Sequence, residues 1–251
     1  MIPSLRIALG QVQLNMGDKR ANCAALLGAV EGAGQRKCDL LVLPECGLAG
    51  WLSPNAREVA EPIPGPFIHQ LQDAAREHRL AIVAGLEELA DGQVYNSAVF
   101  IDERGDLLAT HRKVNELDLA RPVYSTGASL GVFPWRGRRV GLLICADCWR
   151  PELVDALHAM GTDTILSPCA WAVEPGGEST NLAWILENYR QRIGERDLVI
   201  AAANGVGEVS EGPWKGRRLQ GNSLVVRRGD HICGTTNEPE LLIAEIPGSP
   251  G

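Results

Sequence analysis

Apolar and polar positions along this chain follow two periods, one typical of buried strands and one typical of amphipathic helices. Short apolar runs predict buried strands at residues 7–9, 39–43, 141–144, 164–166 and 198–201. Helical spacing of apolar positions predicts helices at residues 19–34, 151–160 and 179–196, and a further one after Pro64-Gly65-Pro66. Because strands and helices alternate, the pattern favours an α/β fold with helices outside the sheets.

Other strands follow one another without a helix between them. Residues 80–86, 94–101 and 107–111 form such a block, and turn-forming Asp91-Gly92 and Glu103-Arg104-Gly105 separate its members. Two more strands are predicted near the end of the chain, at residues 223–226 and 241–246. We find no repeat, linker or shift in composition, so we expect a single domain over residues 1–251.

Composition and charge narrow the class of protein. The chain has 251 residues, of which 45% are hydrophobic, so it can bury a full core. Its net charge is −7, and its basic residues gather only at 136–139 and 215–218, which we interpret as solvated turns; we therefore expect no nucleic-acid partner. No apolar run reaches the roughly 20 residues of a membrane span, and the N-terminus lacks a signal-peptide pattern. Seven irregularly spaced cysteines favour a reducing compartment, so we expect a cytoplasmic protein without membrane contact.

One cysteine stands where an apolar strand ends. The run 141–147 delivers Cys145 to that point, and Pro151 and Glu152 signal a helix soon afterwards. A thiol at a strand-to-helix junction is presented to a pocket, and nearby helix-start amides favour its thiolate. A buried cysteine is more often a small apolar side chain. The pair Cys145 and Cys148 has zinc or dithiol spacing, but no second pair accompanies it, so we expect no metal.

Two ionisable residues occupy similar positions at the ends of other strands. Glu45 follows an apolar run and Pro44, and Lys113 follows the strand at 107–111. Each alone is more often a surface residue. A buried carboxyl group, however, has a raised pKa and can exchange protons near neutral pH. Carboxylate, ammonium and thiol together supply the general base, the oxyanion stabiliser and the nucleophile of acyl transfer.

These three positions lie in motifs that resemble a known family. In chain order, the motifs are Leu43-Pro44-Glu45, His111-Arg112-Lys113 and Ile144-Cys145-Ala146-Asp147 with Pro151-Glu152 behind it, and they are similar to the signatures of the carbon–nitrogen hydrolase (nitrilase) superfamily. Shorter similar pieces extend over nearly the whole chain, among them residues 95–98, 203–207 and 221–223. The resemblance implies an αββα sandwich, homodimers in an αββα–αββα arrangement, and chemistry without a metal or organic cofactor.

The resemblance also implies a mechanism. Cys145 attacks the substrate carbon, Glu45 carries protons, and Lys113 stabilises the oxyanion with help from the backbone amide of Ala146. Glu45 then activates the water that hydrolyses the thioester. Nitrile-cleaving members typically have Cys-Trp-Glu at the nucleophile, whereas Cys145-Ala146-Asp147 is similar to the amidase branch. We therefore expect a small-molecule substrate, a linear amide or carbamoyl compound.

The chain departs from the family at one position. Many members carry a second glutamate after the lysine, and counting back from Gly127 places Ala120 there. Glu116 is our candidate to replace this second glutamate, and Asp118 is the alternative. The role of Glu116 would be to orient Lys113 or the substrate. Three aromatic residues are candidates for lining the pocket, although such residues more often pack in cores. They are Trp149, Trp171 and Tyr124.

The sequence is also compatible with other functions. Without the second glutamate, the fold could be a non-catalytic binding or assembly module. The same thioester also serves nitrile hydrolysis and the transfer of an acyl group to an amine. Against a binding module, all three core chemical residues remain in their motifs. The sequence does not separate hydrolysis from acyl transfer, because the difference lies in whether water or another nucleophile reaches the thioester.

Overall fold

A computed structural model describes residues 3–248 and shows two six-stranded sheets packed face to face. One sheet has the strand order β15 (Glu240–Ile246), β1 (Leu5–Gln11), β2 (Leu40–Val42), β3 (Ala81–Ala90), β4 (Gln93–Ile101), β5 (Leu107–Arg112). The other has the order β14 (Asp230–Cys233), β13 (Leu224–Arg227), β10 (Val199–Asn204), β8 (Thr164–Cys169), β7 (Arg138–Leu142), β6 (Val132–Trp135). A small third sheet has the order β11 (Val206–Glu208), β12 (Arg218–Gln220), β9 (Ala172–Val173).

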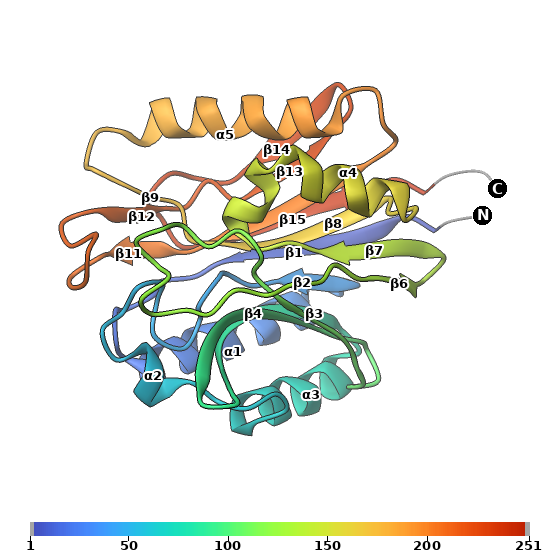
Figure 1. The fold of residues 1–251 in the computed structure, drawn as a ribbon. Helices are drawn as coiled ribbons and strands as arrows, with labels where there is room; N and C mark the ends of the chain where they lie inside the picture. The colour runs from blue at the N-terminus through green and yellow to red at the C-terminus, as the bar shows by residue number, and fades with distance from the viewer. Residues whose placement is uncertain (1–2, 249–251) are drawn as a thin grey trace.

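Helices cover the outer face of each large sheet (Figure 1). The helices α1 (Lys19–Gln35) and α3 (Pro66–His78) cover the sheet of β1, and α2 (Ala56–Val59) lies beside them. The helices α4 (Pro151–Ala159) and α5 (Glu178–Ile193) cover the sheet of β8. The predicted αββα sandwich is therefore confirmed.

The centre of each sheet is parallel, and this determines where strand ends meet. β1, β2 and β3 are parallel neighbours, as are β7, β8 and β10. β4 is antiparallel to both β3 and β5, so β5 runs in the same direction as β2. The carboxyl ends of β2 and β5 consequently lie at the same edge of their sheet, which is where ligands commonly bind in α/β folds.

Burial on both faces explains the continuous apolar runs. Along β2, Leu40 and Val42 face the core between the two sheets, whereas Leu41 packs under the outer helices. A strand covered on both faces needs apolar residues at every position, so its sequence shows no alternation. No helix in the described residues has both the length and the apolar character to cross a membrane.

The structure adds several elements that the sequence pattern did not predict. One is the helix α2, and another is the 3₁₀ turn η1 (Cys145–Trp149) between β7 and α4. The others are five short strands: β6, β9, β11, β12 and β14. Cys145 therefore begins a turn of its own, and the helix that starts at Pro151 comes only after it.

The interpretation of the basic clusters as solvated turns was wrong in part. Arg138 is only 5% exposed, and its Nη2 donates hydrogen bonds to the carbonyl oxygens of Pro247 and Pro3 at 2.7 and 3.2 Å. These backbone carbonyls give the buried guanidinium acceptors for its N–H groups. Arg217, from the second cluster, lines a pocket.

Candidate active site

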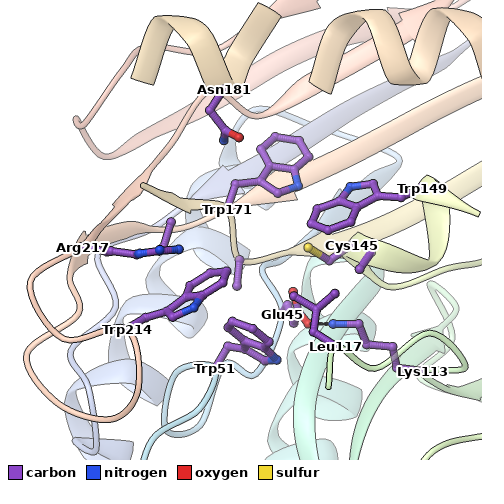
Figure 2. A pocket seen from close by; sticks show the side chains of 13 residues that line it. Glu45, Trp51, Lys113, Leu117, Cys145, Trp149, Trp171, Asn181, Trp214 and Arg217 are labelled. Carbon is purple, nitrogen blue, oxygen red and sulfur yellow. Dashed lines mark hydrogen bonds and ion pairs between the residues drawn. The ribbon is translucent and has the colours of Figure 1, made fainter. Parts of the chain in front are cut away.

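Three strand ends bring a carboxylate, an ammonium and a thiol into one pocket (Figure 2). Glu45 follows β2, Lys113 follows β5 and Cys145 follows β7. Their exposed fractions are 0%, 1% and 6%, so the reactive groups are almost entirely removed from solvent. The pocket that they share has a volume of about 160 Å³.

The carboxylate and the ammonium form a buried ion pair. Lys113 Nζ lies 2.6 Å from Glu45 Oε1, and Asn96 Nδ2 donates to the same oxygen at 2.7 Å. Within residues 3–248, Glu45 Oε2 has no hydrogen-bond partner. Figure 2 shows the carboxylate between the Cys145 sulfur and the Lys113 nitrogen. One oxygen of Glu45 therefore holds the lysine, and the other is free to accept a proton.

Opposing effects act on the lysine. Burial lowers the pKa of Lys113, but the nearby Glu45, Glu116 and Cys145 together raise this pKa well above its ordinary value. The side chain is therefore a cation across the physiological pH range, and it places a fixed positive charge beside the thiol.

The backbone at the cysteine turns sharply. Cys145 has φ = 47°, in the left-handed region that β-carbon-bearing residues rarely adopt, and such strain is typical of functional sites. The N–H groups of Ile144, Cys145 and Asp147 donate to Asp147 Oδ2, Ser167 Oγ and Ile144 O, respectively. Among these consecutive amides of the described chain, only that of Ala146 has no acceptor.

A fully buried aspartate joins the loop that carries the lysine to the turn that carries the cysteine. Asp147 Oδ1 accepts hydrogen bonds from the backbone N–H groups of Val114 and Asn115 at 3.1 and 2.6 Å. Its Oδ2 lies 3.0 Å from Ile144 N and 2.9 Å from His111 Nε2. The two loops are thereby held in one relative position.

The candidate for the second acid lies beside the lysine. Glu116 is 3% exposed, and its Oε2 lies 3.7 Å from Lys113 Nζ. Burial raises the pKa of Glu116 to about 7; the lysine lowers it, and the Glu45 and Asp147 charges raise it. The alternative, Asp118, has a side chain that is 95% exposed, so it points away from the site.

Aromatic rings form most of the remaining pocket wall. Trp51, Trp149, Trp171 and Trp214 all line it, and Arg217 stacks 4.4 Å from the ring centroid of Trp214. Trp51 and Trp214 pack edge-on with their centroids 4.5 Å apart. The wall next to these groups is thus largely apolar.

The model of the carbon–nitrogen hydrolase family matches residues 6–249. The chain belongs to this family. The resemblance stated from the three motifs is therefore confirmed, and with it the expectation of an enzyme of the carbon–nitrogen hydrolase class. Three similar proteins illustrate how far the likeness extends.

An (R)-stereoselective amidase of Pseudomonas sp is 35% identical over 164 residues, which is 64% of this carbon–nitrogen hydrolase and 59% of that amidase. The chain thus spans less than two thirds of that relative's length. An omega-amidase of Bos taurus is 28% identical over 97% of this chain and 88% of its own. The crystal structure of an amidase from Nesterenkonia sp. has a TM-score of 0.83 at 27% identity, covering 98% of this chain and 92% of that one.

One residue expected in the pocket of this hydrolase lies elsewhere. Tyr124 is buried and does not line the pocket; its hydroxyl accepts a hydrogen bond from Leu52 N at 3.2 Å. Glu87 accepts hydrogen bonds from Leu48 N and Ala49 N at 3.1 and 3.2 Å. Tyr124 and Glu87 therefore support, from behind, the loop that carries Glu45. Like most large aromatic residues, Tyr124 packs in the core and not in the pocket.

Trp51, Trp214 and Arg217 are among the pocket residues of this hydrolase that sequence reasoning missed. These three residues lie outside the three motifs and outside the predicted strands. Trp51 follows Glu45 by only six residues, and this proximity was the one local signal that could have identified it. Nothing local marks Trp214 and Arg217, which come from the loop between β11 and β12.

Proposed function

We propose that this protein hydrolyses small linear amides through a thioester on Cys145. The observation that carries the proposal is the buried arrangement of Glu45, Lys113 and Cys145 in one pocket, where Lys113 occupies one oxygen of Glu45 and leaves the other free. Nucleophile, base and oxyanion stabiliser are the parts that acyl transfer requires.

Acylation comes first. Cys145 Sγ attacks the amide carbonyl carbon while Glu45 Oε2 takes the thiol proton. The carbonyl oxygen becomes an oxyanion, and the Lys113 ammonium and the free N–H of Ala146 stabilise it. The protonated Glu45 then gives its proton to the nitrogen, the C–N bond breaks, and ammonia leaves.

Deacylation uses the same groups again. Glu45 takes a proton from a water molecule, whose oxygen attacks the thioester carbon. The second oxyanion collapses, the C–S bond breaks, and Glu45 returns the proton to sulfur as the carboxylic acid leaves. Side chains of this chain perform every proton transfer, so the proposal invokes no cofactor.

The relatives support an amide as substrate. Both curated relatives described above are named amidases, and so is the solved structure. In another solved structure, a glutamate-to-glutamine mutant of the amidase from Nesterenkonia sp. AN1, acrylamide has added to the active-site cysteine. That protein therefore has a nucleophilic cysteine, as we propose for Cys145.

A panel of substrates tests this function directly. We expect release of ammonia and the free acid from primary amides such as butyramide, less from carbamoyl amino acids, and none from nitriles. Turnover of nitriles alone would replace the proposal with nitrile hydrolysis. If hydroxylamine as acceptor suppresses acid formation entirely, the protein is an acyltransferase. The absence of both turnover and thiol labelling would favour a binding module.

We further propose that ionised Glu116 orients the Lys113 ammonium. Because the pKa of Glu116 is about 7, its carboxyl group is mostly neutral below this pH and mostly charged above it. We expect kcat/KM to rise with pH through about 7, and Glu116→Gln to lose that rise and to be about tenfold slower at pH 8. Amide hydrolysis measured between pH 5.5 and 8.5 tests this. A variant with the parent rate and the parent pH profile would remove Glu116 from the site.

For the whole molecule we propose a cytoplasmic homodimer that acts on a small molecule. All seven cysteines of the chain are free thiols, which agrees with a reducing compartment. Light scattering measures the mass in solution directly.

A further inference from the structure

Three tryptophans of the pocket wall, Trp51, Trp149 and Trp171, have buried N–H groups without acceptors among the described residues, and the last two lie together on one side of the pocket (Figure 2). In the described part of the chain, neither Trp149 Nε1 nor Trp171 Nε1 has a hydrogen-bond partner, although both atoms are buried. Trp171 is only 3% exposed. In Figure 2, both nitrogens lie on the edges that the two rings turn toward each other, near the Cys145 sulfur. An unpaired buried N–H is costly, so it marks a place where another molecule supplies the acceptor.

The fold fixes the orientation of both rings. Trp149 packs edge-on against Trp184 with centroids 5.0 Å apart, and Trp171 packs edge-on against Tyr189 at 6.0 Å. Both partner residues lie on the same helix, α5. The two N–H groups therefore point in fixed directions, and neither ring turns to find an acceptor within the protein.

The rest of the pocket offers these donors little to bind. Of the carboxylates within residues 3–248, only Glu45 lines the pocket, and one of its oxygens already accepts from Lys113 and Asn96. Arg217, at the far side, adds further donors, and Asn181, whose Nδ2 donates to Gln220 Oε1 at 2.8 Å, adds one side-chain oxygen. The wall beyond the reacting groups is thus rich in hydrogen-bond donors and poor in acceptors.

From this arrangement we propose that the acyl group of the substrate carries an oxygen acceptor, as in amides of alkoxy or oxo acids, and that Trp149 and Trp171 bind this oxygen through their indole N–H groups. The inference rests on the proposed amidase function. In the free enzyme, water satisfies the two donors. A purely apolar acyl group would expel this water and leave the donors unpaired, whereas an oxygen in the acyl chain replaces it.

Pairs of amides that differ by one atom test this proposal. Methoxyacetamide and butyramide have chains of equal length, with an oxygen in one where the other has a methylene group. 3-Methoxypropanamide and pentanamide form the corresponding pair with the oxygen one bond further out. In each pair we would measure kcat/KM for the ether-containing amide divided by kcat/KM for the alkyl amide. This ratio would be measured for the parent, Trp149→Phe and Trp171→Phe. Comparing ratios between variants cancels the different intrinsic reactivity of the two amides.

In the pair where the parent favours the ether more, we expect Trp→Phe at 149 and at 171 each to lower the ratio by about fivefold, the effect of one lost hydrogen bond. Trp214→Phe is the matched control. Its ring lines the same pocket, but its nitrogen is not among the buried unpaired atoms, so the ratio should stay at the parent value. Parent ratios in both phenylalanine variants and both pairs would overturn the inference.

A binding measurement keeps the proposal testable if a tryptophan variant does not fold. In Cys145→Ala, tryptophan fluorescence reports binding without turnover, and we expect the ether of the favoured pair to bind about fivefold more tightly than its alkane partner. Equal binding in both pairs would contradict the inference. If the parent hydrolyses butyramide but the ratios do not respond to the variants, only this inference fails. If the parent hydrolyses no amide and its cysteine does not acylate, the proposed function itself fails.

Discussion

Replacing Cys145 with serine is expected to lower kcat/KM for amide hydrolysis by at least about 10³-fold. The serine hydroxyl is far less acidic than a thiol, so Glu45 is too weak a base to activate it. The buried position and the sharp turn tolerate serine because it has nearly the same size and shape. Ammonia release from butyramide, measured for both proteins, gives the ratio directly.

Two neighbouring thiols supply the control for this variant. Burial raises the pKa of Cys148 to about 12 and that of Cys169 well above its ordinary value, so neither forms a thiolate at pH 8. Cys148→Ser should therefore keep turnover within a few-fold of the parent, and chloroacetamide should label Cys145 first. The assignment would be wrong if Cys145→Ser hydrolysed amides at the parent rate, or if Cys148 were labelled before it.

Replacing Glu45 with glutamine is expected to reduce amide turnover by about 10³-fold, because the amide group neither accepts the thiol proton nor activates water. An oxygen remains to accept from Lys113, so the lysine keeps its position. An activated ester such as p-nitrophenyl butyrate needs no protonation of its leaving group. The variant should therefore release about one equivalent of p-nitrophenol and then stop as a thioester, which mass spectrometry of the intact protein detects.

A second buried carboxylate provides the comparison. Glu61 pairs with Lys19 at 2.8 Å and accepts from Phe67 N at 2.7 Å, and it does not line the pocket. Glu61→Gln should lower stability but leave turnover within a few-fold of the parent. Full turnover of butyramide by Glu45→Gln, or an ester reaction without a trapped thioester, would exclude Glu45 as the base.

Much of the fold and the central site could be predicted from local patterns. Strands buried on both faces are continuous apolar runs, so the polar residue that ends each run is conspicuous in the sequence. This is how Glu45 and Cys145 were recognised, and Lys113 follows its strand in the same manner. Because the central strands are parallel, such ends gather at one edge, which the structure shows for β2 and β5.

The rest depended on contacts between distant segments. Trp214 and Arg217 reach the pocket only through the way in which β11 and β12 are placed against β9. Arg138 is buried because the two chain ends bring their carbonyls to it. Tyr124 is an aromatic residue of the kind that lines pockets, but the backbone N–H of Leu52 donates a hydrogen bond to its hydroxyl in the core. No spacing along the chain encodes these encounters.

The hydrogen bonds of Asp147 matter for any attempt to build this site into another protein. The Asp147 carboxylate accepts hydrogen bonds both from the backbone after β5 and from the backbone before the cysteine. The two loops, which are distant in the sequence, therefore form one structural unit. A scaffold that received only the cysteine turn would present a thiol without a defined partner. Conversely, a mutation in either segment affects both. Mutations that improve turnover of a new substrate are best sought among the tryptophans that line the pocket, because these hydrogen bonds do not involve them.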